Sequence, residues 1–595
     1  MAETKSVADF VIQRLYDWGV RCIYGYPGDG VNALAGSLAR RQADIKFVQA
    51  RHEEEAAFMA CAHAKYSGEV GVCLATSGPG AVHLLNGLYD AQKDHMPVVA
   101  IVGQQALTAL GANYQQELDL TALFKDVARE YIQLATRPAQ MRHLMDEAVR
   151  IAIAKRCVTC IVIPNDLQKE PMEAPQRSHG FTFSGVGYSR PRTLPAAEDL
   201  ERAAEVLNAG QKVGMLVGAG IKDARAEVME VAELLGAGVA KAILGKTMLS
   251  DKLPYVTGSI GLLGTEASDK MMKNCDTFLM IGTSFPYAEF LPEEGQARGV
   301  QIDIESANLG LRYPHEVNLH GDARETLRAL IPLLKKKQDR AWREQIEGWV
   351  KDWWAVVEAR AMDAADPINP QRVVWEMSKR LPENALMSCD SGSGTNWYAR
   401  HIKAGDGMIG TLGGGMATMC PGVPYITAAK FCHPERPGFA IVGDGAMQMM
   451  GISALITIAK YWKEWQDPRL VVLVLNNQDL NQVTWEQRVM EGDPKASVTQ
   501  DIPDFPYDSY AEQIGLVGLR MSTVDDVEQV WDEALRAERP VVINAYVDPN
   551  VPPMPPHITF EQARNYAKSL IGGDPDAMGE IKQTLRSMAS KYFHD

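Results

Sequence analysis

Short apolar runs alternate with segments of helical period along the whole of this chain. Ten of these runs read CIYGYPG, VGVCLAT, VVAIVG, CIVIPND, VGMLVGAG, FLMIGTS, VQIDIE, FAIVGDG, LVVLVLNN and VVINAYV. Continuous apolar runs of this length are typical of parallel strands that helices cover on both faces. Most of them lead into Gly, Ser, Asp or Asn, as expected where strands end in ligand-carrying loops. The pattern predicts an α/β fold built on doubly wound parallel sheets.

The length of the chain requires more than one such sheet. At about 150 residues per domain, a chain of this size should form three or four domains. Residues 170–198 are rich in Pro, Gly and Ser and read as a linker, whereas 335–368 is charged, contains four Trp residues and reads as a connecting helix. We therefore predict three α/β domains and a C-terminal tail, at 1–170, 195–333, 366–549 and 550–595.

Composition excludes several function classes. The net charge of −15 argues against a nucleic-acid surface, which needs a basic footprint. The chain shows no signal peptide and no apolar stretch near the ~20 residues of a membrane span. Of the nine cysteines, only Cys157 and Cys160 have redox or metal spacing, and without a second pair structural thiols are the favoured interpretation. We expect a reduced, cytoplasmic protein.

The tail contains a helical stripe formed by Ile581, Leu585, Met588 and Tyr592. We expect this stripe to pack onto the body of the protein. A helix lying on a membrane surface is the less favoured alternative.

One strand–helix–strand segment has the pattern of a metal and phosphate site. A strand ends in Gly443-Asp444-Gly445, a helix follows, and the next strand ends in Asn476-Asn477. Both strand ends emerge on the same edge of a parallel sheet. Asp and Asn supply the hard oxygen ligands that suit Mg²⁺, and the glycines let backbone N–H groups approach a phosphate. The whole element is a strong signal, whereas GDG alone would be weak.

A second segment, RHEEEAAFMA at 51–60, places three carboxylates directly before an apolar helical run. Acidic residues are favoured at a helix N-terminus, so these ten residues alone favour a solvated first turn. The alternative is that one of the three is buried and takes part in chemistry.

Together these segments resemble the thiamine-diphosphate enzymes of the pyruvate oxidase and acetohydroxyacid synthase group, and the resemblance covers nearly the whole chain. It implies a pyrimidine-binding N-terminal domain, a central FAD-type domain and a C-terminal diphosphate-binding domain. The long KEWQDP connection departs from the family but lies away from the ligands. The metal ligands would be Asp444, Asn477 and the main-chain oxygen of Asp479, and the cofactor would also contact Gly392, Gly445 and Ala446.

The same resemblance separates the three carboxylates. Glu53 matches the family's catalytic carboxyl, which binds the pyrimidine N1′ and promotes the imino tautomer whose N4′ removes the C2 proton. Such a carboxyl must be largely dry, which raises its pKa. Glu54 and Glu55 would be ordinary helix-start charges or local hydrogen-bond partners. In GTLGGGMATMCPG, Met416 would wedge between the cofactor rings and the Gly414 carbonyl would accept a hydrogen bond from N4′.

Two further residues are expected to be catalytic. Pyruvate oxidases typically carry His at the position of His83, where acetohydroxyacid synthases usually have Asn. A His there could orient a carboxylate or shuttle a proton, although a His on an apolar helix is more often a core residue. Gln116 in NYQQEL matches the family's active-site Gln.

The middle domain resembles the flavin-binding one. Gly218 and Gly220 follow a strand, and Asp303, Ile304 and Asp322 would contact the adenosine portion of FAD. A glycine turn alone is a weak signal, because any α/β turn can require it. Some family members keep this fold without flavin, so FAD is expected rather than required.

The substrate pocket departs from the family. Gln115, Ser391 and Gln482 stand where pyruvate oxidases have aromatic or apolar groups, and Asp29 and Glu486 add polar groups. A site built for hydrogen bonding rejects substrates that lack the matching groups. We therefore predict a keto acid, or an acceptor, more polar than pyruvate. The same departures weaken a role in flavin electron transfer inferred from the family's phenylalanines.

The favoured function is decarboxylation of a 2-keto acid with oxidation through FAD, which a VPPMPPHITFEQA segment like that of quinone-linked oxidases supports. A carboligase of the acetolactate synthase kind, or a non-oxidative decarboxylase, is the alternative. A non-catalytic paralogue is disfavoured because Glu53, Asp444 and Asn477 are present. A nicotinamide dehydrogenase is disfavoured because a clean G-x-G-x-x-G is missing. The family builds its site between subunits, which implies a homodimer or homotetramer.

Overall fold

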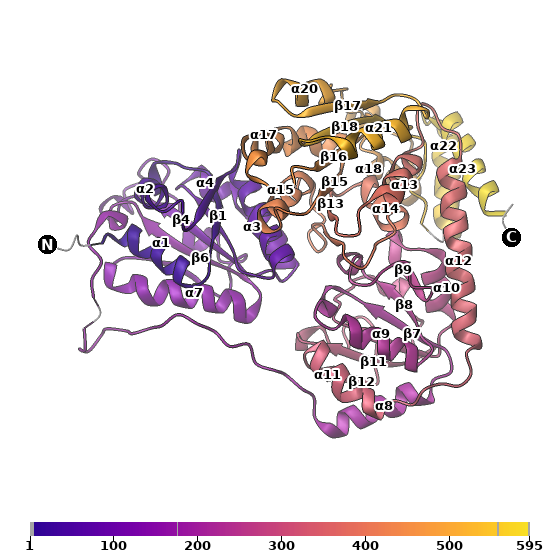
Figure 1. The fold of residues 1–595 in the computed structure, drawn as a ribbon, viewed down its shortest axis with the longest axis horizontal. Coiled ribbons are helices and arrows are strands. Elements are labelled where there is room, and N and C mark those ends of the chain that lie inside the picture. The colour runs from indigo at the N-terminus through magenta and orange to yellow at the C-terminus, as the bar shows by residue number, and fades with distance from the viewer. Residues whose placement is uncertain (1–4, 175, 556–558, 593–595) are drawn as a thin grey trace.

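The computed structural model describes residues 5–174, 176–555 and 559–592, so part of the VPPMPPHITFEQA segment lies outside the described residues. It contains three six-stranded sheets, one in each predicted domain range, and all of their strand pairs are parallel (Figure 1). Each of the ten apolar runs forms a strand. The predicted fold class, three doubly wound α/β domains, is confirmed.

The N-terminal sheet has the strand order β2-β1-β3-β4-β6-β5. Helices cover both faces of this sheet, and successive side chains of a strand enter different cores. Ile23 packs with α1 and α7 on one face, and Tyr24 packs with α3 on the other. The strands are β1 Cys22–Gly25, β2 Lys46–Gln49, β3 Gly71–Ala75, β4 Val98–Gln104, β5 Ile132–Leu134 and β6 Val158–Pro164. The helices are α1 Val7–Asp17, α2 Asn32–Arg40, α3 Glu53–Ser67, α4 Pro79–His83, α5 Leu85–Lys93, α6 Leu120–Leu123 and α7 Met141–Lys155.

The central sheet has the order β12-β11-β10-β7-β8-β9. The described residues of 170–196 form a long connection without a helix, and the last two residues of the predicted linker already belong to α8 (Figure 1). The predicted connecting helix is α12, Ala341–Met362. The strands are β7 Val213–Val217, β8 Gly238–Lys241, β9 Val256–Ser259, β10 Thr277–Ile281, β11 Arg298–Asp303 and β12 Val317–His320. The helices are α8 Ala197–Ala209, α9 Arg225–Leu234, α10 Glu266–Asn274 and α11 Ala323–Leu330.

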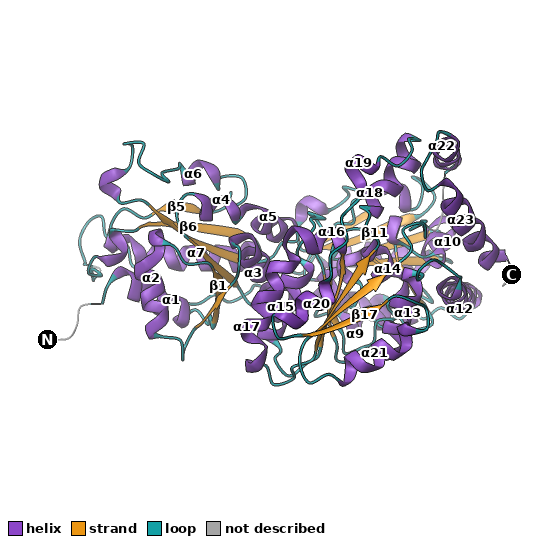
Figure 2. Cartoon of the chain, turned by 90° about the horizontal axis from the view of Figure 1, so that it is seen from above, coloured by secondary structure: helices purple, strands orange, loops and turns teal. Residues whose placement is uncertain are grey.

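The C-terminal sheet has the order β14-β13-β15-β16-β18-β17, with α15, α17 and α20 on one face and α13, α14 and α21 on the other (Figure 2). The strands are β13 Leu386–Cys389, β14 Ile409–Thr411, β15 Gly438–Gly443, β16 Leu470–Asn476, β17 Val517–Met521 and β18 Val541–Tyr546. The domain helices are α13 Pro370–Arg380, α14 Ser393–His401, α15 Gly422–Cys432, α16 Asp444–Ala446, α17 Ile452–Tyr461, α18 Asn481–Glu486, α19 Ser497–Gln500, α20 Tyr507–Gln513 and α21 Asp526–Arg536, and the tail forms α22 Phe560–Ile571 and α23 Ala577–Tyr592.

Helices α3 and α15 join the N-terminal and C-terminal domains through one continuous core. The rings of Phe58 and Tyr425 lie 6.5 Å apart, and the Cys61 Sγ lies 3.1 Å from the Tyr425 hydroxyl. Helices that are apolar on every side are typical of such buried positions. The contact fixes α3, which begins at Glu53, relative to the chain that enters α15.

The tail is held by polar contacts. Arg488, whose side chain is 2% exposed, donates two hydrogen bonds of 2.8 Å to Asp574 and a third to Glu580. Gln583 donates to Asp548 at 2.9 Å. Since these residues turn one face of the tail inward, the predicted packing of its apolar stripe is wrong: Ile581, Leu585 and Met588 are exposed, and the side chain of Tyr592 lies outside the described residues.

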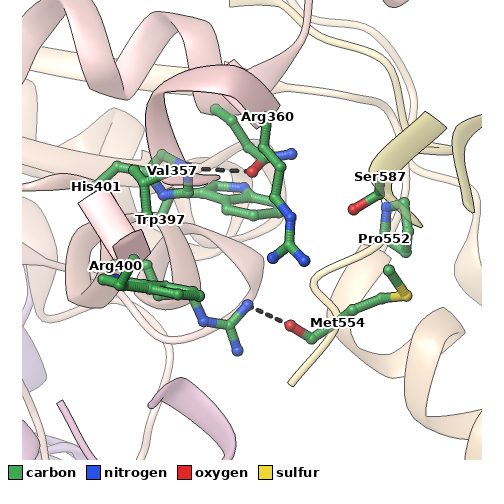
Figure 3. Close-up of a pocket in the computed structure, with 10 residues that line it drawn as sticks. Val357, Arg360, Trp397, Arg400, His401, Pro552, Met554 and Ser587 are labelled. Atoms are coloured by element: carbon green, nitrogen blue, oxygen red, sulfur yellow. Dashed lines mark hydrogen bonds between the residues drawn. The ribbon is translucent and has the colours of Figure 1, made fainter. Parts of the chain in front are cut away.

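The chain that leads into the tail passes two arginines, Arg400, which is buried, and Arg360, which is half-buried. Arg400 donates a 2.6 Å hydrogen bond to the Met554 carbonyl, and Arg360, Pro552 and Ser587 line the same junction (Figure 3). The cavity there measures about 10 Å³, which is room for one water molecule. The junction is therefore packed interior. Among the described residues, no helix combines the length and apolar character needed to cross a bilayer.

Replacement of Arg488 by Met should weaken the attachment of the tail to the C-terminal domain, because the buried carboxylates of Asp574 and Glu580 would lose their cation. Removing one partner of a buried pair costs about 3–5 kcal/mol. We expect a lower free energy of unfolding in urea and faster proteolytic cleavage of the tail. The matched control is Arg298→Met, which breaks an exposed pair with Glu316 and should cost less than about 1 kcal/mol. Equal effects of the two variants would contradict a buried tether.

Candidate active site

Glu53 is the first residue of α3, and it is 7% exposed. The Nδ1 atom of His83, at the end of α4, lies 3.0 Å from its Oε2 atom. A Cβ atom at Gly80 would come within 3.0 Å of the Glu53 Oε1 atom, so glycine lets the start of α4 approach this closely. The structure therefore brings together two of the three predicted catalytic residues.

His52 also belongs to this group, although the sequence argument did not single it out. Its ring lies 4.3 Å from that of His83, and burial, followed by the charge of His83, lowers the pKa of His52. A neutral imidazole beside a carboxyl can accept or pass on a proton. The ligand atoms of His52, Glu53 and His83 lie within 4.8 Å of one another, a spacing that could also hold a metal ion. Its place directly before Glu53 was the available signal.

The two following carboxylates are not alike. Glu54 is half-buried and accepts a 2.7 Å hydrogen bond from Asn86, whereas Glu55 is completely buried and accepts one of 2.8 Å from the Arg51 N–H. Burial raises the pKa of Glu55. The interpretation that only one carboxylate of the triplet is buried is therefore wrong. Because other elements cover α3 on several sides, two of its three carboxylates, Glu53 and Glu55, are buried.

Further predicted residues lie at the carboxyl edge of the N-terminal sheet. Gln116 has a left-handed backbone, with φ 64°. A Cβ atom at Gly78 would lie 2.7 Å from the Cβ atom of Gln116. The exposed Asp29 is within 3.5 Å of the Thr76 hydroxyl. Gln115 is exposed on the turn before Gln116. Asp29 and Gln116 thus approach the loop that carries His83, and Gln115 lies at its rim.

Asp444 follows β15 and is 3% exposed. Its carboxylate accepts hydrogen bonds from the N–H groups of Gly445, Asn477 and Gln478, at 2.9, 3.0 and 2.6 Å. Burial raises its pKa to about 7, and the negative charge of Asp479 adds to the effect. A divalent cation would supply the positive charge that this buried carboxylate lacks.

The other predicted metal ligands lie on the loop after β16. The Asn477 Oδ1 atom accepts a 3.1 Å hydrogen bond from the Asp479 N–H, which holds the loop in a tight turn. The Asp479 side chain is engaged by the Thr484 hydroxyl at 2.9 Å and the Lys495 amine at 3.2 Å. Its main-chain oxygen remains as the donor, as the resemblance implies. The donor set fits Mg²⁺.

Two non-glycine residues with a left-handed backbone lie next to predicted cofactor residues. Gln478 follows Asn477 with φ 57°, and Ala417 follows Met416 with φ 51°. Such conformations cost free energy and persist where the surrounding structure imposes them, often at functional sites. The Met416 side chain is 38% exposed, so it projects from its loop rather than joining the core.

Asp390 is a functional candidate that the sequence argument missed. It accepts hydrogen bonds from the N–H groups of Ser391, Cys420 and Gly422, at 2.9, 2.8 and 3.1 Å. Burial raises its pKa to about 7. It therefore ties the Ser391–Gly392 turn to the chain that enters α15. An Asp directly after a strand was the signal that could have identified it.

A polar row connects α14 and α18. The Gln482 Oε1 atom accepts a 2.9 Å hydrogen bond from Asn396, and its Nε2 atom donates one of 3.0 Å to Glu486. Asn396 is 3% exposed and was not predicted. Two of the predicted pocket residues, Gln482 and Glu486, are thus brought together; Ser391 is half-buried after β13.

In the central domain, packing explains the two predicted glycines. A Cβ atom at Gly218 would lie 2.6 Å from the Gly282 carbonyl oxygen, and one at Gly220 would lie 2.7 Å from the Gly282 Cα atom. Asp303 ends β11 and Ile304 follows it. Asp322 comes after the adjacent β12 and caps α11, because its side chain accepts a 3.1 Å hydrogen bond from the Glu325 N–H. These three residues lie at one edge of the sheet. Their contact with adenosine stays a prediction.

Comparisons with known proteins agree with this geometry. Models of thiamine pyrophosphate enzymes match 5–123 as the N-terminal TPP binding domain, 200–330 as the central domain and 390–545 as the C-terminal TPP binding domain. The Bacillus subtilis protein YdaP, provisionally named as thiamine pyrophosphate-containing, is 34% identical over 95% of this chain and 96% of its own. The chain belongs to the thiamine pyrophosphate enzyme family.

Two further relatives indicate the range of activities in the family. Pyruvate oxidase of Lactiplantibacillus plantarum is 28% identical over 90% of this chain and 88% of its own. Acetolactate synthase isozyme 2 large subunit of Escherichia coli is 30% identical over 92% of this chain and 97% of its own. The chain is thus similar to enzymes with both of the activities that the sequence left open.

Replacement of Glu53 by Gln should slow deuterium exchange at C2 of bound thiamine diphosphate at least about a hundredfold, because the amide cannot hold an acidic proton toward the cofactor. NMR of the acid-quenched cofactor measures this rate. Glu55→Gln is the matched control, because it changes a buried carboxyl on the same helix and should leave exchange within about threefold of wild type. A similar loss in both variants would contradict the assignment of Glu53.

Replacement of Asp444 by Asn should raise the Mg²⁺ concentration needed for thiamine diphosphate binding at least about tenfold, because a carboxylate ligand is lost. Calorimetric titration at several Mg²⁺ concentrations measures the change. The control is Asp504→Asn, beyond the same sheet edge, where the carboxylate contacts Asn476 and Tyr546. Unchanged Mg²⁺ dependence in Asp444→Asn would exclude Asp444 as a ligand.

Proposed function

We propose that this protein decarboxylates a 2-keto acid with thiamine diphosphate and Mg²⁺ and passes the electrons to FAD in the central domain. When bound, thiamine diphosphate supplies a carbon nucleophile and an electron sink. The observation that carries the proposal is the 3.0 Å contact of His83 with the buried carboxyl of Glu53. The resemblance associates a His at this position with pyruvate oxidases, and the similarity to a pyruvate oxidase supports the same direction.

Each half of the site has a separate task in this proposal. Glu53 holds a proton toward the pyrimidine ring, and His83 and His52 orient or relay protons beside it. Asp444, Asn477 and the Asp479 carbonyl, which protein hydrogen bonds bring together on one loop edge, would hold Mg²⁺ for the diphosphate. The glycines that precede and follow Asp444 leave room for the phosphate groups.

The polar row suggests the substrate class. Asn396, Gln482 and Glu486 form a continuous chain of hydrogen bonds in which two members are amides. Asn396 is buried and Gln482 half-buried, so a ligand that enters here must replace the hydrogen bonds that these amides lose on binding. We therefore propose a 2-keto acid that carries a hydroxyl or a second acidic group.

The assembly is a homodimer or homotetramer in this proposal. Among the described residues, no hydrogen bond or ion pair joins Glu53 or His83 to the Asp444 loop of the same chain. The His83 side chain is 42% exposed beside the buried carboxyl, and Met449, after the Asp444 turn, is 66% exposed. A second copy would cover both surfaces and complete each site. Cytoplasmic location stays a prediction.

A carboligase of the acetolactate synthase kind is the second candidate. The similarity to acetolactate synthase large subunits over more than nine-tenths of the chain supports it. The fold is shared by the two activities, so the electron acceptor decides between them. A ligase would keep any bound flavin oxidised and release a condensed hydroxyketo acid.

Anaerobic mixing with a keto acid should bleach the visible flavin absorption of the purified protein, because FAD would be reduced. The panel should contain pyruvate and hydroxylated and acidic keto acids, each with thiamine diphosphate and Mg²⁺. Bleaching should be fastest with a polar keto acid and absent in Glu53→Gln. Product formation with fully oxidised flavin, or protein that binds no flavin, would favour the carboligase or simple decarboxylase. Equal rates on pyruvate and polar keto acids would contradict the substrate proposal.

A further inference from the structure

The loop at 412–416 is pressed from two other domains of the chain. A Cβ atom at Gly413 would lie 2.7 Å from the Asp90 Oδ1 atom, and one at Gly415 would lie 2.9 Å from the Asp94 Oδ1 atom. A Cβ atom at Gly414 would lie 2.6 Å from Leu244 of the central domain. A Cβ atom at any glycine of the GGG sequence would therefore displace a side chain from another domain.

One carboxylate holds this loop by its backbone. The Asp94 Oδ2 atom accepts a 3.0 Å hydrogen bond from the Gly414 N–H, and its Oδ1 atom accepts one of 2.6 Å from the Gly415 N–H. Asp94 is 6% exposed and follows α5, on the side of the N-terminal domain that faces the C-terminal domain (Figure 2). Hydrogen bonds to an ionised, buried acceptor are among the stronger ones.

Lys65 of α3 completes the contact. Its amine donates a 2.5 Å hydrogen bond to Asp94 and one of 2.7 Å to the Leu412 carbonyl, so it binds both the carboxylate and the loop. We call the Asp94–Lys65 pair the clamp. Burial disfavours the charged amine, but Asp94 outweighs it and raises the pKa of Lys65. The loop is thus held at three successive peptide groups by an ion pair that the N-terminal domain supplies.

The geometry of the peptide bond gives this contact a direction. In a trans peptide the C=O and N–H groups point in opposite directions. The Gly415 N–H shares its peptide with the Gly414 carbonyl, so the bond to Asp94 turns that carbonyl away from Asp94. The Gly414 carbonyl is the group that the resemblance assigns to the N4′ amine of the cofactor.

We propose that Asp94, paired with Lys65, is a positioning residue that aims the Gly414 carbonyl and presents Met416 to the aminopyrimidine of thiamine diphosphate. The proposal rests on the proposed function only for the identity of this ligand. It assigns the N-terminal domain a second task besides carrying Glu53. Through Asp94, that domain orients the acceptor within the C-terminal domain of its own chain.

The first test needs no cofactor. In Asp94→Asn, an NH₂ group replaces one of the two oxygens that each accept an N–H, and NH₂ cannot accept. Hydrogen exchange of the 412–416 amides should therefore accelerate at least about tenfold, measured by mass spectrometry. The matched control is Glu464→Gln, because the Lys46–Glu464 pair joins the same two domains at the surface, away from this loop. Unchanged exchange in Asp94→Asn, or equal acceleration in the control, would overturn the clamp.

The second test measures whether the Gly414 carbonyl is correctly oriented. Deuterium exchange at C2 of bound thiamine diphosphate should slow at least about tenfold in Asp94→Asn, whereas its Mg²⁺-dependent binding should change less than about threefold. This readout needs neither keto acid nor flavin, so a failure of the proposed oxidation leaves it unaffected. Slow exchange with equally weakened binding would instead indicate a merely structural role and overturn the proposal.

A double variant distinguishes loss of loop orientation from a general loss of stability. Asp94→Asn leaves the buried Lys65 charge without its partner, which is strongly destabilising. Lys65→Met combined with Asp94→Asn removes both charges and should recover most of the lost thermal stability while C2 exchange stays slow. Recovery of exchange together with stability would show that the carboxylate is not needed to orient the loop.

Discussion

The packing of α3 against α15 is the contact on which the rest of the site depends. Both helices are buried almost all round, and they share one core with the strands of two domains. The contact places Glu53 at one end of α3 and Lys65 near the other, so a single rigid helix carries a predicted catalytic carboxyl and a loop clamp. Because interiors are close-packed, a shift of α3 would move both together.

The sequence predicted the fold class where strands are covered on both faces. All ten apolar runs form strands, whereas the eight strands it did not identify include all six sheet edges: β2, β5, β9, β12, β14 and β17. Edge strands pair on one side only and carry mixed polarity, as in VNLH of β12. Their apolar signal is weak because half of their surroundings is solvent or loop.

The candidate site was predictable where its parts are local in sequence. Asp444 and Asn477 lie at the ends of neighbouring strands, so a strand–helix–strand pattern identifies both. Asp390, Asn396 and Asp94 act through contacts with residues far along the chain, and Asp94 is 320 positions from Gly414. The periodicity of apolar residues along the sequence does not predict contacts between residues so far apart. Glu55 shows the same limit, because it is buried beside Thr457 of α17, which lies far along the chain.

The GGG loop shows how the three domains converge on one element. Asp90 and Asp94 press on it from the N-terminal domain, and Leu244 from the central domain. The central domain also holds the preceding strand, since the Thr247 hydroxyl accepts a 3.0 Å hydrogen bond from the Gly410 N–H. Glycine removes the side chains that would keep these neighbours away, and the cost in backbone freedom is offset by hydrogen bonds from two domains. The position of the loop is therefore a property of the whole chain.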